Sequence, residues 1–227
     1  MSKPKRIILI RHGESQGNVD KTVYSKFPDY AIYLTNKGKL QAGEAGMKLK
    51  EILQSESYGC YYSPYFRARQ TMDLAVRVID NDLSYNKNRF FKKEEVRIRE
   101  QEYSGKLRVG RHDDDKDRDE YGKFFYRQTG GESAADVFDR VCDFIGALHR
   151  DFEKLDYPSN CLIFAHGMSN RVFIKKFLHC SVEEFETWKN PRNGEIYILE
   201  LQVNNKYKLI TDIQKHATGY GYQYKLA

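Results

Sequence analysis

The stretch IILIRHGE at residues 7–14 decides the fold of this chain. Residues 7–10 are apolar and mostly β-branched, and a run that is apolar on both faces is typical of a central parallel strand. Arg11 and His12 follow where that strand is predicted to end, and Gly13 permits a sharp turn there. Because ligands bind beyond the carboxyl ends of strands in an open parallel sheet, we expect Arg11 and His12 at a binding site.

Other short runs predict further strands around this one. Residues 161–165 form a second buried run, which ends at His166. The remaining candidates are residues 58–63, a weaker strand at 96–98, and a C-terminal pair at 195–202 and 207–213. A hairpin turn through Asn204 and Asn205 is predicted to join that last pair.

Helical patterns lie between the predicted strands. The clearest spans residues 132–155, where apolar residues recur with a 3.6-residue period. The other predicted helices are residues 35–53 with Thr35 as cap, 66–79, 168–178 and 182–188. Strands that alternate with helices imply an α/β fold. We predict three α/β/α layers, in which helices flank a mostly parallel central sheet.

One region breaks this alternation. Residues 81–128 are polar and charged, and we interpret them as an insertion over the carboxyl edge of the sheet. The acidic run at residues 112–120 is interpreted as a solvated helix start rather than a metal site, because consecutive carboxylates on a helix point in different directions. No linker or repeat divides the rest, so we expect a single domain over residues 1–227.

Composition narrows the class of protein without naming a function. The chain has 227 residues, 40% of them hydrophobic, and a net charge of +6, which suits an anionic partner. No apolar run approaches the roughly 20 residues that span a bilayer, and the N-terminus lacks a signal-peptide core. The four cysteines lack metal-binding spacing, and with no export signal we expect free thiols in a cytoplasmic protein.

Two further motifs place charge at strand ends. In SPYFRARQT, residues 63–71, Ser63 can cap the following helix, and Arg67 lies one turn inside it. His166 opens another strand-to-helix turn, and Asn18 lies six residues after His12, within reach of the same pocket. Guanidinium groups bind phosphate oxygens and an imidazole can attack phosphorus, so this set predicts a phosphoryl site. Arg69 faces another side of the helix and is assigned to surface or packing.

These motifs carry a resemblance to a known family. RHGESQGN at residues 11–18, residues 63–71 and FAHG at 164–167 resemble the signatures of the histidine phosphatase superfamily, also called phosphoglycerate mutase-like proteins. LTNKG at residues 34–38 resembles the family's short LTxxG turn. Residues 118–127 and 130–137 look like a subgroup from plants and fungi that includes acid phosphatases of broad range.

The resemblance implies a role for each matching residue. His12 would be the nucleophile that forms a phosphohistidine, and Asn18 would be a hydrogen-bond donor in the pocket. Arg11, Arg67 and His166 would hold the phosphoryl oxygens. In the stretch REQEYSG, residues 99–105, Glu100 takes the place of the general acid, with Glu102 as the nearby alternative. This scheme needs no metal and no cofactor, because two arginines and two histidines supply the positive charge.

Three functions are compatible with this constellation. We favour a phosphomonoester hydrolase acting on a small phosphate ester; the alternatives are a cofactor-dependent phosphoglycerate mutase and a non-catalytic phospholigand-binding module. Compared with the family's mutases, residues 100–105 retain Tyr103, a shared candidate for substrate binding, but lack the Arg and His beside it.

The loop before the long predicted helix is the candidate for the substrate mouth. Arg127 and Tyr126 are candidates to meet the non-transferred part of the substrate, whereas Glu132 is either part of that mouth or an ordinary acidic residue at a helix start. Nothing in the motifs suggests a nucleic-acid partner. The oligomeric state, the physiological substrate and the role of the Tyr-rich tail at residues 216–227 stay open.

Overall fold

The sheet is mixed and mostly parallel. A computed structural model describes residues 3–80, 91–103, 117–118 and 120–216. These residues form a six-stranded sheet in the order β3-β2-β4-β1-β5-β6. The parallel strands are β1 (Arg6–Arg11), β2 (Tyr58–Tyr62), β3 (Phe91–Glu94) and β4 (Asn160–Ala165). The antiparallel strands are β5 (Ile196–Leu201), which pairs with β1, and β6 (Tyr207–Leu209), which follows it as a hairpin.

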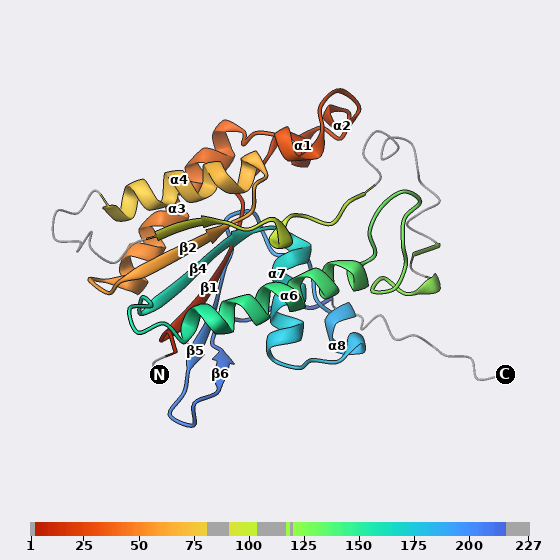
Figure 1. Cartoon of the computed structure of the whole chain (residues 1–227). Helices are drawn as coiled ribbons and strands as arrows, with labels where there is room; N and C mark the ends of the chain where they lie inside the picture. The colour runs from red at the N-terminus through yellow and green to blue at the C-terminus, as the bar shows by residue number, and fades with distance from the viewer. Residues whose placement is uncertain (1–2, 81–90, 104–116, 119, 217–227) are drawn as a thin grey trace.

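Helices cover both faces of this sheet (Figure 1). One layer consists of α3 (Asn36–Leu53) and α4 (Phe66–Asp80), and the other of α6 (Ala134–Phe152) and α7 (Gly167–Phe177). Alternate residues of β1 supply the two cores: Ile8 and Ile10 pack under the first layer, whereas Ile7 and Leu9 pack under the second. The predicted three-layer α/β fold is confirmed.

Short elements complete the described chain. They are α1 (Gln16–Val19), α2 (Val23–Lys26), the 3-10 turns η1 (Asp29–Ala31) and η3 (Val96–Ile98), and α8 (Val182–Glu186). No helix among the described residues is long and apolar enough to cross a membrane.

Side-chain caps mark the starts of the predicted helices α3 and α6. The Thr35 hydroxyl accepts the Gly38 N–H at 3.0 Å, which makes Thr35 the N-cap of α3 as predicted. At α6, Ser133 and Asp136 form a reciprocal capping box. The apolar stripe predicted for residues 132–155 ends at Phe152, the last residue of α6. Leu155, which the sequence assigned to this stripe, lies beyond the helix and is fully exposed.

The prediction of a strand over residues 96–98 was wrong. Those residues form η3, whose first turn is capped by the Glu95 side chain accepting the Arg97 N–H. The strand lies just before it, as β3, with the sequence FKKE. An edge strand pairs on one side only and stays half exposed, so it needs no apolar run.

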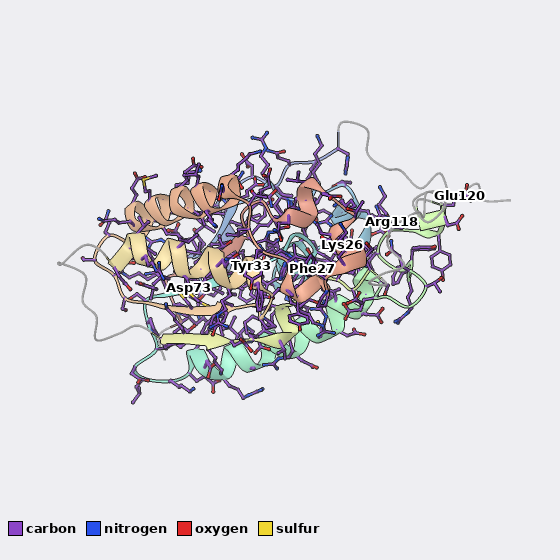
Figure 2. All side chains as sticks on the ribbon, turned by 90° about the horizontal axis from the view of Figure 1, so that it is seen from above. Lys26, Phe27, Tyr33, Asp73, Arg118 and Glu120 are labelled. Atoms are coloured by element: carbon purple, nitrogen blue, oxygen red, sulfur yellow. The ribbon has the colours of Figure 1, made fainter. Side chains whose placement is uncertain are left out.

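The segment interpreted as an insertion is therefore not one unit. Its residues 91–94 belong to the central sheet, and the turn that follows packs against α6. Residues 81–90, most of the acidic run and the tail from residue 217 lie outside the described residues. Arg118 and Glu120 lie together at the end of the molecule away from Asp73 (Figure 2).

Gly13 is required for a different reason from the predicted turn. A Cβ atom at Gly13 would lie 2.2 Å from the backbone oxygen of Gly38. A Cβ at Gly38 would in turn lie 2.0 Å from the Glu14 carbonyl oxygen. The two backbones thus touch, and this contact holds the segment after β1 against the start of α3.

Candidate active site

Three neighbouring strands end at the sequence motifs. Backbone pairing continues one residue past the strands, because the His12 N–H donates to the Ala165 carbonyl at 3.1 Å and the Ser63 N–H to the Phe164 carbonyl at 3.0 Å. His166 follows directly after β4. The carboxyl edge of the sheet thus aligns both histidines with Ser63, as predicted for ligand sites of parallel sheets.

His12 is held in one tautomer. Its side chain is buried, and Nδ1 lies 2.7 Å from the Gly13 carbonyl oxygen. A carbonyl oxygen only accepts hydrogen bonds, so Nδ1 carries the proton and Nε2 keeps its lone pair. The ring centroid lies 5.1 Å from that of His166. Nε2 is therefore available as a nucleophile.

The charge state of His12 suits the same role. Burial lowers its pKa well below the ordinary value of 6.5, and the positive charges of Arg67 and Arg11 lower the pKa further. Both effects disfavour the imidazolium form. The neutral, nucleophilic form of His12 thus predominates at neutral pH.

His166 is fixed at one nitrogen and open at the other. Its Nε2 lies 2.8 Å from the Ser63 hydroxyl, whereas its buried Nδ1 has no hydrogen-bond partner among the described residues. Buried polar atoms normally have a partner, so an unpaired ring nitrogen beside His12 suits a ligand oxygen. Burial, followed by the charge of Arg67, lowers the pKa of His166 well below its usual value.

Arg67 is buried at the first turn of α4, where it is aimed by an acidic residue that sequence reasoning missed. Its Nη1 donates to the Asp29 carbonyl oxygen at 2.7 Å and to Asp29 Oδ1 at 2.8 Å. The guanidinium also stacks on Tyr65, 4.9 Å from the ring centroid. Asp29 lies in η1, and nothing in its local sequence signals a partner on α4.

Arg11 is the second cation beside the histidines. Its Nη1 donates to the Pro191 carbonyl, and its buried Nε has no partner among the described residues. Burial lowers the pKa of Arg11, while the Glu100 carboxylate opposes that shift. Arg11, Glu100 and both histidines are thus close enough to influence one another.

Glu100 completes the cluster. One carboxylate oxygen and one ring nitrogen each of His12 and His166 lie within 4.8 Å of one another. Glu102, the alternative acid, does not belong to this cluster; its backbone N–H donates to Glu132. The geometry favours Glu100 over Glu102 as the acid.

The same three groups could in principle ligate a metal ion. However, Arg67 and Arg11 lower the pKa of His12, which means that they oppose a positive charge at this place. A cation would meet the same repulsion, whereas an anion would be attracted. The donor set therefore fits an anion better than a metal.

Asn18 presents its amide group through a small network. Its Oδ1 accepts from the Ser15 N–H at 3.0 Å and from Asn193 Nδ2 at 3.1 Å. The backbone donor identifies this atom as the oxygen, so the NH2 group is the end left for a ligand. Asn193 also donates to the His12 carbonyl at 3.1 Å. Sequence reasoning missed Asn193, which comes from the loop before β5.

A network on α6, also missed, holds the segment that carries Glu100. Arg140 donates to the carbonyl oxygens of Arg97, Arg99 and Glu100. Its guanidinium also pairs with Glu132, Nη2 to Oε2 at 2.9 Å. Glu132 is therefore neither a plain helix-start acid nor a lining residue, because its carboxylate anchors this segment.

The remaining candidates lie farther out. Tyr103 lines a cavity of about 480 Å³ beside the cluster, together with Gln101 and Met168. Arg127, predicted to meet the substrate, instead pairs with Asp136 at the start of α6, and its side chain is 60% exposed. Its neighbours Tyr126 and Gln128 line the cavity. The direction of Arg127 could not be read from its position in a loop.

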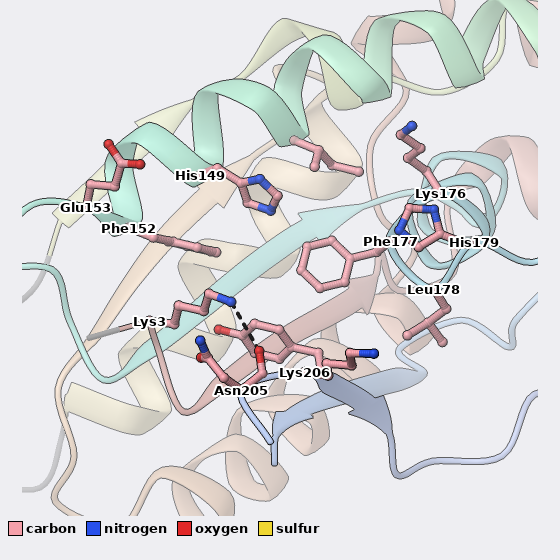
Figure 3. A pocket seen from close by; sticks show the side chains of 12 residues that line it. Lys3, His149, Phe152, Glu153, Lys176, Phe177, Leu178, His179, Asn205 and Lys206 are labelled. Carbon is pink, nitrogen blue, oxygen red and sulfur yellow. Dashed lines mark hydrogen bonds between the residues drawn. The ribbon is translucent and has the colours of Figure 1, made fainter. Parts of the chain in front are cut away.

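A larger cavity lies at the other end of the sheet (Figure 3). It measures about 860 Å³ and is lined by the ends of α6 and α7 and by the β5–β6 turn, with Lys3 from the segment before β1. None of the sequence motifs reaches it, so size alone does not identify the site.

Comparisons with known proteins agree with this geometry. A family model described as the histidine phosphatase superfamily (branch 1) matches residues 7–211. The chain is 41% identical over 220 residues to the phosphoglycerate mutase-like protein AT74 of Arabidopsis thaliana, covering 91% of this chain and 68% of the relative. It is 29% identical over 303 residues to the broad-range acid phosphatase DET1 of Saccharomyces cerevisiae, covering 94% and 91%.

The fold also matches solved structures. A mycobacterial glucosyl-3-phosphoglycerate phosphatase superposes with a TM-score of 0.69 at 17% identity, covering 92% of this chain and 98% of the other. At that identity the likeness concerns the fold alone.

Proposed function

The chain belongs to the histidine phosphatase superfamily, and from that premise we propose that it hydrolyses small phosphate monoesters through a phosphorylated His12. The observation that carries the proposal is the cluster of Glu100, His12 and His166, whose reactive atoms lie within 4.8 Å of one another. It combines a nucleophile, an acid and an oxygen-binding group in one place.

The first half of the reaction transfers the phosphoryl group. Nε2 of His12 attacks phosphorus, and the bond from phosphorus to the alcohol oxygen breaks. Glu100 gives its proton to that oxygen, so the product leaves as a neutral alcohol. Arg11, Arg67 and His166 stabilise the charge on the phosphoryl oxygens in the transition state. Asn18 contributes a further hydrogen bond.

The second half releases phosphate. The Glu100 carboxylate takes a proton from water while the water oxygen attacks phosphorus. The bond between nitrogen and phosphorus breaks, its electron pair returns to His12, and Glu100 is protonated again. The enzyme thus ends in the state in which it began.

The exchange of His12 for alanine tests the mechanism. We expect His12→Ala to lose hydrolysis of p-nitrophenyl phosphate by at least about 10³-fold, because the covalent step is removed. His149→Ala, a change at the distant cavity, is the matched control and should keep normal turnover. Brief exposure of the unchanged protein to a ³²P-labelled ester should leave acid-labile label on the chain. Full turnover by His12→Ala would refute the mechanism.

Metal independence is a separate part of the proposal. The two arginines supply the charge that Mg²⁺ supplies in other phosphoryl-transfer enzymes. Turnover should therefore survive dialysis against EDTA. Loss of turnover that added Mg²⁺, Mn²⁺ or Zn²⁺ restores would contradict this part and leave the role of His12 to be tested separately.

Water is proposed to be the acceptor rather than a second phosphoglycerate. Names of relatives such as acid phosphatase and 2-carboxy-D-arabinitol-1-phosphatase support hydrolysis. Incubation with 3-phosphoglycerate and 2,3-bisphosphoglycerate should release free phosphate and little 2-phosphoglycerate. Formation of 2-phosphoglycerate in excess of phosphate would identify a mutase instead.

A further inference from the structure

We propose that the cavity of about 480 Å³ beside the catalytic cluster binds the non-transferred part of the substrate, and that it selects esters whose alcohol carries a second anionic group. This inference rests on the proposed function. The second group would be a carboxylate or another phosphate, since both have the oxygen geometry that guanidinium groups bind.

The cavity lies where the alcohol part of the ester must go. Gln101 and Tyr103 line it, and they are the first and third residues after the acid Glu100 in the sequence. Met168, two residues beyond His166, lines its other side. Burial lowers the pKa of Arg171 and the negative charge of Glu100 opposes that shift, which means that Arg171 also lies near the acid. A substituent on the leaving alcohol would therefore meet this cavity.

The described lining of the cavity carries mainly positive charge. Among the residues that the structure describes, Arg118, Lys123 and Arg171 line it, and Glu186 is the one carboxylate beside them. Glu186 is buried, and its Oε1 accepts the Phe124 N–H at 3.0 Å.

The same positive charges affect a histidine in the cavity. His216 also lines the cavity, and the largest cause that lowers its pKa is burial. The charges of Lys123, Lys189 and Arg171 lower that pKa further. Lys123 and Arg171, two of the lining cations, thus both lie close enough to His216 to lower its pKa.

Arg171 is the centre of this arrangement because its contacts with the described residues are all to uncharged groups. Its Nε donates to the Gly167 carbonyl at 3.4 Å and its Nη1 to the Trp188 carbonyl at 3.2 Å. Its Nη2 approaches only the Met168 sulfur, at 3.8 Å. Among the described residues, no carboxylate forms an ion pair with it. Burial lowers its pKa, which is the cost that a bound anion would offset.

The apolar part of the lining limits the kind of ligand. Met168, Phe185 and Trp188 are buried, and the Arg171 guanidinium lies 5.2 Å from the centroid of the Phe185 ring. The buried Nε1–H of Trp188 has no hydrogen-bond acceptor among the described residues. A compact acid with a short carbon chain suits such a surface better than a large neutral sugar, which would leave Arg171 unpaired.

Matched pairs of esters test the inference. Glycerol 3-phosphate and 3-phosphoglycerate differ in one carboxylate, whereas fructose 6-phosphate and fructose 1,6-bisphosphate differ in one phosphate. We expect kcat/KM to be higher for the more anionic member of at least one pair. In Arg171→Gln that advantage should fall by about 10- to 100-fold, the range of a hydrogen-bonded charge, while turnover of p-nitrophenyl phosphate changes less than about 3-fold. The pair affected identifies the second group.

Controls separate a lost subsite from a damaged fold. Arg150→Gln, an exposed residue near the end of α6, makes the same change of charge and should leave both pairs unaffected. Lys123→Gln changes a second cation of the same cavity, and it should reduce the advantage in the same direction. Equal losses for both members of each pair would overturn the inference.

A binding measurement keeps the inference testable if no ester is turned over. Calorimetry with His12→Ala should give a lower Kd for 3-phosphoglycerate than for glycerol 3-phosphate, or for fructose 1,6-bisphosphate than for fructose 6-phosphate. Adding Arg171→Gln should abolish that difference. Absence of turnover with the difference intact would refute the proposed hydrolysis but support the subsite. Equal Kd values for both members of both pairs would overturn the subsite.

Discussion

The His12 side chain is buried, yet the lone pair on its Nε2 stays available to a ligand. The Gly13 carbonyl holds the proton on Nδ1, and the arginines keep the ring neutral without contacting its lone pair. The motif around residue 12 was recognisable from the sequence because its residues are neighbours. Asp29 was not, because it meets Arg67 only through the fold.

The lowered pKa values of His12 and His166 predict a pH dependence. Both groups have a pKa below 6.5 in the folded chain, so the unfolded chain binds more protons once the pH falls through that value. The free energy of unfolding should therefore decrease as pH falls from about 6.5 toward the lowered values. The nucleophile should stay unprotonated below pH 6.5.

Nitrogen-15 NMR of the imidazoles checks this prediction directly. Both rings should titrate below pH 6.5, although Glu100 lies close enough to offset part of the effect of Arg11 and Arg67. Urea unfolding at several pH values gives the stability. A midpoint of His12 above pH 6.5 would contradict the prediction.

Asp29→Ala should weaken both the fold and phosphate binding. Arg67 and Asp29 are almost fully buried, and removing one partner of a buried ion pair costs about 3 kcal/mol or more. Inorganic phosphate should recover part of that loss, because it supplies Arg67 with another anion. Thermal unfolding with and without phosphate measures both effects. Asp73→Ala, which removes an exposed pair with Lys92, is the control and should change stability by less than about 1 kcal/mol.

At the scale of elements, patterns in the sequence predicted the strands and helices that are buried in the core. The central strands and the main helices lie in buried runs, so periodicity and caps identified them. The edge strand β3 has a polar sequence and was missed, because its position depends on pairing with β2 rather than on its own residues. The anchoring of Glu100 by α6 was also hidden, since Arg140 lies 40 residues farther along the chain.

Arg140→Gln should uncouple α6 from the segment that carries the acid. The variant loses the ion pair with Glu132 and most of the three bonds to carbonyl oxygens of residues 97–100. We expect kcat to fall by about 10-fold or more, because a misplaced acid protonates the leaving group less well. The stability should fall by about 3 kcal/mol.

A comparison of two esters separates a misplaced Glu100 from a general loss of stability. Loss of acid catalysis should be larger for an alkyl phosphate than for p-nitrophenyl phosphate, whose leaving group needs less protonation. Equal losses for both esters in a folded variant would argue against a positioning role for Arg140.

At the scale of the whole molecule, the net charge of +6 does not create the anion site. Arg67 is buried in the first turn of α4 and Arg11 is partly buried at the end of β1, whereas surface lysines such as Lys5 and Lys154 pair with nearby carboxylates. The site would attract phosphate even in a chain of zero net charge. The surplus adds weak, salt-sensitive attraction at most.

Thiol labelling should report the opening of the whole fold. Cys60 and Cys161 are buried in the two opposite cores, and burial raises the pKa of both. In a Cys142→Ser/Cys180→Ser variant, Ellman's reagent should therefore react with Cys60 and Cys161 only as fast as the protein unfolds. Addition of urea should accelerate both together. Prompt labelling of the native variant would contradict this two-sided packing.

The edge strand has a consequence for concentrated solutions. β3 presents Lys92, Lys93 and Glu94 along one border of the sheet, and β6, at the other border, has only three residues, with Lys208 exposed at its centre. Charged or very short borders are poor templates for a strand from another molecule. Aggregation of this protein should therefore begin from opened chains, and conditions that preserve the folded state should also preserve a clear solution.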